Sequence, residues 1–397
     1  MKPYKGVKIL IFLLMCIFSF SAYGKNKEPG LTLKVQNIIY SAQKKIEKKD
    51  YEGAEEILLK FIEKNQKESH YLVEFTLGNV LALKGENEEA LFHYRESTRL
   101  YSDYGHSWQN LGKVYFDLKR YDKAGDCLIK GYELSDKKDL SLIYWASCSY
   151  IMAKKEKKAL SHLEYLVTNK KCRPETRWYE ALLNVYMQLN LTKKALKTVY
   201  NLLCQEEGNP IWWKFLANIY LQQNDYKRAL CAMTVYSYLT PLTSEEITLL
   251  GELNNIVGLP LQAAKYYEDI IASGKKPSDY KRLALAYISG HKPEKAKNIL
   301  EKALKEKPAS EFWSILGQVL YKEEKFDEAY IAFKQSAKLN PEDGKAYLMM
   351  GYCAFENGRK NEAKNALKKA AKFSKYKKTA KKLLKHIALF SDDKTQH

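Results

Sequence analysis

The sequence contains little glycine and little proline: 19 Gly and 10 Pro occur among 397 residues. Sandwiches, propellers and other turn-rich β architectures depend on these residues for their many chain reversals. Lysine, leucine, alanine, glutamate and tyrosine are abundant instead. The composition therefore favours helices and disfavours a β-sandwich, a propeller or a Rossmann-type enzyme.

An apolar stretch long enough to cross a bilayer is lacking too. The stretch at residues 9–20 has about 12 residues, whereas a membrane-spanning helix needs roughly 20. Three lysines precede it, and the small residues Ala22 and Gly24 follow it, which is the pattern of an export signal. We expect residues 1–24 to be cleaved, leaving a soluble protein in the periplasm or otherwise outside the cytoplasm; the alternative is a retained N-terminal anchor.

Catalytic motifs are missing as well. The seven histidines do not fall at metal-ligand spacings, and no HExxH, CxxC, GxSxG or glycine-rich phosphate loop occurs. We therefore expect a protein that is not an enzyme, with no catalytic residues, no cofactor and no metal site.

A repeat of about 34 residues is what the sequence does contain. Trp108, Leu111, Gly112 and Tyr115 begin one clear unit, and similar frames start near Trp213 and Trp313. A small residue marks each unit at intervals of 33 to 36 residues: Ala54, Ala90, Ala124, Ala159, Ala195, Ala229, Ala263, Ala296, Ala329 and Ala363. The pattern W-x2-L-G-x2-Y…A-x3-F…P resembles that of tetratricopeptide repeats.

That resemblance implies two helices per repeat. With Trp108 at position 4, positions 4, 7, 8 and 11 form the apolar stripe of the first helix, and position 20 is the small residue of the second. Position 8 is usually Gly or Ala, with Ser147 and Leu183 as departures that predict looser packing. A large side chain at position 24 fills the space above, and stacked hairpins share one continuous core.

We therefore predict an all-α fold, a right-handed superhelix (α-solenoid) of about ten helical hairpins over residues 35–375. A disordered lead at 25–34 should precede it. A capping helix at 376–390 and a disordered tail at 391–397 should follow.

Six cysteines remain beyond the signal, and they allow fifteen complete disulfide pairings. Cys172 and Cys204 are the pair we favour, because both lie near the ends of second helices in adjacent repeats. Small apolar helix residues are the alternative interpretation of all six.

First helices line a concave groove in this architecture, and we expect the protein to be a scaffold that binds a segment of another envelope protein in that groove. Because positions 4, 7, 8 and 11 belong to the core, positions 2, 5, 9 and 12 should face the groove. Candidate residues for binding a protein or peptide are Lys113, Tyr144, Glu180, Asn184, Lys214, Asn218, Lys281 and Gln318. Each of them is equally well interpreted as a solvated polar side chain.

Acidic residues are outnumbered, since 66 Lys and Arg face 47 Asp and Glu for a net charge of +19. From Arg359 to Lys385 the chain has twelve basic residues and one acid, Glu362. Attachment to an anionic membrane or cell-wall surface is thus an alternative function. Export argues against nucleic acid as the partner.

From Arg173 onward, the sequence resembles periplasmic tetratricopeptide proteins associated with TonB–ExbB–ExbD systems. The stretches that carry the resemblance are Asn209–Met233, Ile247–Lys275 and Gly344–Lys372, and Gly258–Ala264 is the most distinctive element. The resemblance implies a periplasmic scaffold that assists TonB-dependent uptake. It supplies no site residues to carry over.

Overall fold

The computed structural model describes residues 28–65, 70–169, 172–274 and 277–392. Within these ranges the regular structure consists of 21 helices, with no strand among them. The prediction of an all-α fold is confirmed. The predicted export signal at 1–24 lies outside the described residues. The chain divides into unit 1 (Met1–Ala195) and unit 2 (Leu196–His397), and each is described by itself.

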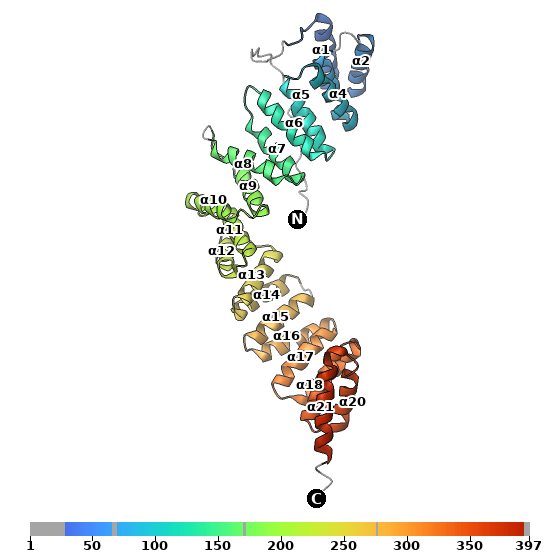
Figure 1. Cartoon of the computed structure of the whole chain (residues 1–397), viewed down its shortest axis with the longest axis vertical. Helices are drawn as coiled ribbons and strands as arrows, with labels where there is room; N and C mark the ends of the chain where they lie inside the picture. Colours follow the sequence, from blue (N-terminus) through green and yellow to red (C-terminus); the bar gives the residue numbers. More distant parts are fainter. Residues whose placement is uncertain (1–27, 66–69, 170–171, 275–276, 393–397) are drawn as a thin grey trace. The chain divides into compact units, whose positions relative to one another are not determined.

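Unit 1 consists of helix pairs that follow one another along the chain (Figure 1). Its helices are α1 (Leu33–Glu47), α2 (Tyr51–Lys64), α3 (Tyr71–Lys84), α4 (Asn87–Leu100), α5 (Gly105–Asp117), α6 (Tyr121–Leu134), α7 (Leu140–Met152), α8 (Glu156–Thr168) and α9 (Thr176–Gln188). Helix α10 (Thr192–Gln205) begins in unit 1 and ends in unit 2.

Unit 2 continues the same arrangement and ends with an unpaired helix. It contains α11 (Pro210–Gln222), α12 (Tyr226–Leu239), α13 (Ser244–Ile256), α14 (Pro260–Ser273), α15 (Pro277–Ser289), α16 (Pro293–Glu306), α17 (Ser310–Lys322), α18 (Phe326–Leu339), α19 (Gly344–Glu356), α20 (Lys360–Ala370) and α21 (Ser374–Asp392). Helix α21 packs on both α19 and α20, which is the place expected of a cap.

Both ends of the array differ from the predicted boundaries. Helix α1 begins at Leu33, where the Thr32 hydroxyl caps it by accepting a hydrogen bond from the Val35 N–H. Residues that precede it contact α3, since the Tyr71 hydroxyl donates to the Glu28 carboxylate at 2.5 Å. Part of the predicted lead is therefore ordered by tertiary contacts that sequence composition does not reveal. At the other end, α21 extends to Asp392, into the predicted tail.

Each repeat turns through one residue in the left-handed conformation at position 15. Three of these ten residues are glycines (Gly85, Gly258 and Gly358), and seven are not: Lys49, Lys119, Lys154, Asn190, Asn224, His291 and Glu324. In every repeat the next N–H donates to the carbonyl of position 11, as Arg120 does to Tyr115 at 2.8 Å. This bond closes a Schellman-type turn, so the main chain itself defines the hairpin.

The two helices of a hairpin meet where position 8 lies against position 24. A Cβ atom added to Gly78 would lie 2.8 Å from the Tyr94 ring, and one added to Gly317 would lie 2.9 Å from the Phe333 ring. Glycine is thus required at these two positions, because the aromatic ring at position 24 lies too close to leave room for a side chain. The departures Ser147 and Leu183 are both fully buried, so neither leaves a gap open to solvent.

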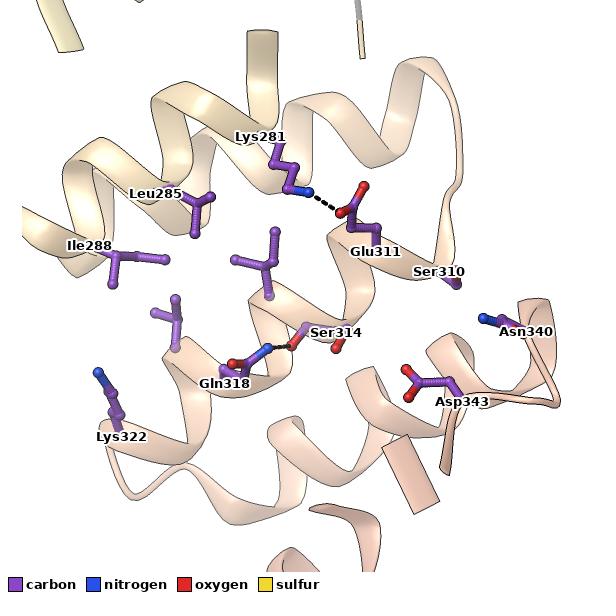
Figure 2. A pocket seen from close by; sticks show the side chains of 12 residues that line it. Lys281, Leu285, Ile288, Ser310, Glu311, Ser314, Gln318, Lys322, Asn340 and Asp343 are labelled. Atoms are coloured by element: carbon purple, nitrogen blue, oxygen red, sulfur yellow. Dashed lines mark hydrogen bonds and ion pairs between the residues drawn. The ribbon is translucent and has the colours of Figure 1, made fainter. Parts of the chain in front are cut away.

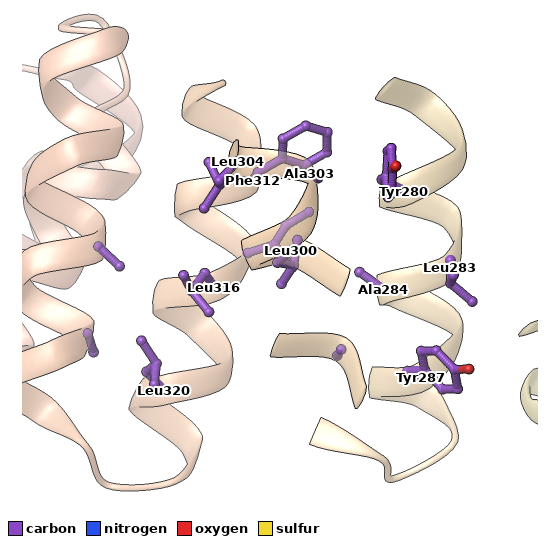
Figure 3. Close-up of a cluster of buried hydrophobic side chains, with 14 of the residues drawn as sticks. Tyr280, Leu283, Ala284, Tyr287, Leu300, Ala303, Leu304, Phe312, Leu316 and Leu320 are labelled. Carbon is purple, nitrogen blue, oxygen red and sulfur yellow. The ribbon is translucent and has the colours of Figure 1, made fainter. Parts of the chain in front are cut away.

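The small residue at position 20 is buried in all ten repeats, with at most 1% of its surface exposed. In unit 2, apolar side chains of the consecutive helices α14 to α20 form one cluster, shown for α15 to α17 in Figure 3. Tyr280, Leu300 and Phe312 there come from three successive helices. The stacking expected from the repeat pattern is therefore present.

Cation–π contacts join the two helices of a hairpin, and ion pairs join one hairpin to the next. Five tyrosines at position 11 lie under a Lys or Arg side chain at 4.6 to 5.8 Å from the ring centroid: Tyr115, Tyr150, Tyr186, Tyr220 and Tyr287. Ion pairs also cross between repeats, as Arg120 contacts Glu88 at 2.7 Å. Because such pairs are exposed, each contributes only about 0–1 kcal/mol.

A more buried network joins α11, α12 and α13. The Glu246 carboxylate accepts hydrogen bonds from Lys214 Nζ (2.6 Å), the Tyr236 hydroxyl (2.9 Å) and the Thr243 N–H (2.9 Å). Burial acts to raise the pKa of Glu246, but these hydrogen bonds outweigh it and hold that pKa below its usual value of 4.5. The ionised carboxylate therefore stabilises the fold.

We predict that Gly112→Leu destabilises the hairpin of α5 and α6. A Cβ at this position would lie 2.8 Å from Leu128 Cγ and 3.2 Å from the Ala124 carbonyl, and overpacking costs about 1–3 kcal/mol. Ala229→Phe should act in the same way in unit 2, because Ala229 is fully buried. Hydrogen exchange measures the effect. Gly208→Leu is the control, since its Cβ would meet no atom within 4 Å. Equal amide protection in all three variants would contradict the assignment of Gly112 and Ala229 to the contact between the two helices.

We also predict that Glu246→Gln lowers stability in a pH-dependent way. The pKa of Glu246 is lowered by folding, so its contribution is present above about pH 4.5 and is lost as pH falls through the lower folded pKa. The variant should lose about 1 kcal/mol at neutral pH, because Lys214 is exposed and its charge is screened. Urea unfolding of both proteins at neutral pH and in acid, below the folded pKa of Glu246, measures the free energy of unfolding. A difference between variant and wild type that is the same in acid as at neutral pH would rule the prediction out.

Candidate functional site

The eight residues predicted to line a groove all lie on first helices of their repeats. In unit 1 they lie on α5, α7 and α9, and in unit 2 on α11, α15 and α17. None is buried: Lys113, Tyr144, Glu180, Asn184, Lys214, Asn218, Lys281 and Gln318 are all exposed or half-exposed. The register of the repeat thus places these side chains outside the core, and their role in binding stays a prediction.

Three ionisable side chains lie on one stripe of α5. His106, Lys113 and Asp117 each keep solvent contact and fall within about 40° of one another on the helix. Desolvation by the surrounding helices nevertheless lowers the pKa of His106 and Lys113 and raises the pKa of Asp117. Desolvation therefore disfavours the charged form of each of these three groups.

Helices α7 and α9 contact each other and carry the next part of this surface. The Arg177 guanidinium lies over the Tyr144 ring at 5.0 Å, and its Nε contacts the Glu175 carboxylate at 2.5 Å. One turn farther along α9, the half-buried Glu180 has its pKa raised by burial. Asn184 is exposed one further turn along. Unit 1 therefore presents an aromatic ring, a cation and a carboxylate side by side.

The side chain of Lys214 in unit 2 forms contacts within the molecule. Its ammonium pairs with Glu246 at 2.6 Å and lies 5.4 Å from the Tyr236 ring. These contacts join consecutive hairpins, so Lys214 has a structural role that its position in the repeat did not indicate. Asn218, one turn later on α11, is half-exposed.

Lys281 and Gln318 are brought together at a recess between α15 and α17, with a volume of about 540 Å³ (Figure 2). Lys281 forms an ion pair with Glu311. Gln318 accepts a hydrogen bond from Lys345 Nζ at 3.0 Å and donates one to the Ser314 carbonyl at 3.0 Å. Both predicted residues thus belong to one site.

Most residues that line this recess were not predicted, because only polar and aromatic residues at the groove positions were chosen from the sequence. Leu285 and Ile288 occupy positions 9 and 12 of α15, so the same register would have found them had apolar residues been included. Leu285 is 41% exposed. Asn340 and Asp343 come from the segment between α18 and α19, which no repeat position identifies. The recess therefore combines an apolar wall with a polar rim.

The cysteines correct one prediction. Cys127, Cys148, Cys172, Cys204, Cys231 and Cys353 are all free thiols. The favoured Cys172–Cys204 disulfide is therefore not formed: Cys172 precedes α9 in an exposed segment, and Cys204 is exposed near the end of α10.

In the part of the chain that the structure describes, no group of three or more His, Cys, Asp and Glu side chains is arranged to hold a metal ion. None of the helices in those residues has the length and apolar character that crossing a membrane requires.

Comparisons with solved structures give several helical-repeat proteins. A tetratricopeptide repeat protein from Parabacteroides merdae ATCC 43184 is 17% identical, with a TM-score of 0.38 over 63% of this chain and 98% of that one. YrrB, a tetratricopeptide protein with an unusual peptide-binding site, is 18% identical, with a TM-score of 0.38 over 47% of this chain and 97% of its own. The hetero-tetramer Cut9–Hcn1 of the anaphase-promoting complex is 13% identical, with a TM-score of 0.35 over 90% of this chain and 97% of that one.

Two family models match parts of the sequence, and no curated protein matches it. The model of anaphase-promoting complex (cyclosome) subunit 3 matches residues 300–370. The tetratricopeptide repeat model matches residues 105–138 and 280–310, which contain α5, α6 and most of α15 and α16. Together with the helix pairs at the predicted spacing, these matches show that the chain carries tetratricopeptide repeats.

Proposed function

We propose that this chain is a non-catalytic exported scaffold that binds an extended segment of another cell-envelope protein along the outer face of its first helices. The recess between α15 and α17 is the observation that carries the proposal. Its volume of about 540 Å³ lies within the range of about 300–1,000 Å³ typical of ligand sites.

The chemistry of the recess fits a peptide. Leu285 and Ile288 offer apolar surface that is not covered by the fold, and the buried Ile315 and Val319 lie behind it. An apolar side chain of a bound segment would remove this surface from water. The amide of Gln318 and the hydroxyl of Ser314 are placed to hydrogen-bond the peptide main chain, whose polar groups need partners.

Unit 1 offers a second contact surface of different character. The outer stripe of α5 and the Tyr144–Arg177–Glu180 group on α7 and α9 provide ionisable groups whose charged forms are disfavoured by desolvation. A bound segment that carried the complementary charges would relieve that penalty. Asn184 of unit 1 is a better residue to substitute than Lys214 of unit 2, because replacing Lys214 would also break its bond to Glu246.

A location outside the cytoplasm is part of the proposal. The positively charged start, the apolar stretch at residues 9–20 and the small residues after it support export. The resemblance of the C-terminal two thirds to periplasmic tetratricopeptide proteins supports a role beside a TonB–ExbB–ExbD system. Co-purification of the tagged chain with such a complex tests that role.

We predict that Leu285→Asp weakens peptide binding at least tenfold. The carboxylate would have to lose its water when an apolar side chain of the peptide packed on this wall, and burying a charge costs more than about 1.4 kcal/mol. Peptides selected from a random library on the purified chain, measured by fluorescence anisotropy, give the affinities. Ile331→Asp is the matched control, because Ile331 is 56% exposed on α18 and lies outside the recess. Equal losses in both variants, or none in either, would overturn the recess as the binding site.

We further predict that the mature protein begins at Lys25 and fractionates outside the cytoplasm. Signal peptidase cuts after small residues at the third and first positions before the site, which Ala22 and Gly24 supply. Cell fractionation with N-terminal sequencing measures this. A cytoplasmic protein that keeps Met1 would contradict it, and Gly24→Leu should block cleavage as the control.

A further inference from the structure

The C-terminal end contains a run of cations without counter-charges. Between Glu362 and Asp392 the chain has ten lysines and no acid. Elsewhere, lysines and arginines commonly pair with carboxylates of the same or the next repeat. Within the described residues, none of these ten lysines forms an ion pair. The positive charge of this end is therefore not neutralised by the fold.

Helix α21 sorts its residues into a covered face and an open one. Ala380 and Ile387 are fully buried where α21 packs on α19 and α20, and Leu383 and Leu384 lie beside them. Four exposed lysines fall within one stripe about 100° wide on the opposite side of the helix: Lys378, Lys381, Lys382 and Lys385. In the part of α21 whose side chains the structure describes, residues 374–388, the apolar face is thus already covered, and the lysine stripe faces away from it.

We infer that this lysine stripe docks the protein peripherally on an anionic lipid surface. Clusters of four to eight basic residues on an amphipathic helix bind acidic headgroups, and each lysine near such a surface adds about a five-fold increase in affinity. Because Ala380, Leu383, Leu384 and Ile387 of α21 pack against α19 and α20, this part of the helix attaches by charge and keeps its apolar side chains in the fold.

The composition of the stripe favours lipid over nucleic acid. It contains lysines only, and a lysine ammonium is a point charge, whereas base-edge readout uses the planar donors of Arg, Asn and Gln. Single-stranded nucleic acid also requires exposed aromatic rings for stacking. Tyr376, the aromatic residue at the start of α21, packs against the α19–α20 cluster and lies under Lys375. A smooth anionic surface is the partner that these groups fit.

Sedimentation of the mature protein with vesicles tests the inference. Vesicles of phosphatidylcholine with phosphatidylglycerol should bind it, vesicles of pure phosphatidylcholine should not, and added salt should release it because it screens exposed charges. Replacing Lys378, Lys381, Lys382 and Lys385 by Gln should weaken binding at least about a hundredfold. Replacing the same four by Arg should preserve binding, which separates loss of charge from loss of fold.

A matched control carries the same change in net charge elsewhere. Lys157, Lys193, Lys197 and Lys302 are exposed and lie far from α21 in the sequence; their replacement by Gln should leave binding within a few-fold of wild type. The inference is overturned if both sets of substitutions weaken binding equally, if pure phosphatidylcholine binds equally well, or if a DNA duplex binds more tightly than the acidic vesicles. None of these measurements depends on the peptide recess.

Discussion

The close approach of position 8 to position 24 is the contact on which the rest of the structure depends. At Gly78, Gly251 and Gly317 a ring of the second helix fills the space where a side chain would be, which fixes how each hairpin closes. Because the hairpins close alike, their first helices are presented alike. Position 9 lies outside the core in every repeat, and position 5 does so in all but the last, where Leu348 is buried. A surface for binding is therefore a by-product of the packing that holds each hairpin together.

The two units use that surface differently. In unit 2, Lys214, Lys281 and Lys345 are held by groups on the next or the preceding first helix. In unit 1, desolvation is the main influence on Lys113 and Glu180, and their pKa values move towards the neutral forms. Charges satisfied within the fold stabilise the stack, whereas unsatisfied ones leave interaction energy available to a partner.

The fold could be predicted because the repeat is periodic along the sequence. Contacts between residues far apart in the sequence could not be predicted in this way. The small residues at position 20 identified all ten repeats, because burial at a fixed spacing leaves a trace in one sequence. The bond from Lys214 to Glu246 crosses 32 residues and leaves no such trace. Leu285 and Ile288 were passed over because an exposed leucine at a groove position looks like a core residue until the structure shows its surroundings. The cysteine pair failed since adjacency in repeat number does not bring two side chains together.

The left-handed residue at position 15 has a consequence for how the repeats change over generations. Seven of the ten turns manage without glycine, because the N–H that follows still bonds to the carbonyl of position 11. A turn specified by the main chain tolerates Lys119 or Glu324 as well as Gly85, at a modest energetic penalty. Mutations can therefore accumulate at these turns without altering the hairpin. Ten repeats can keep one hairpin geometry while their sequences diverge, and the tetratricopeptide model matches residues 105–138 and 280–310.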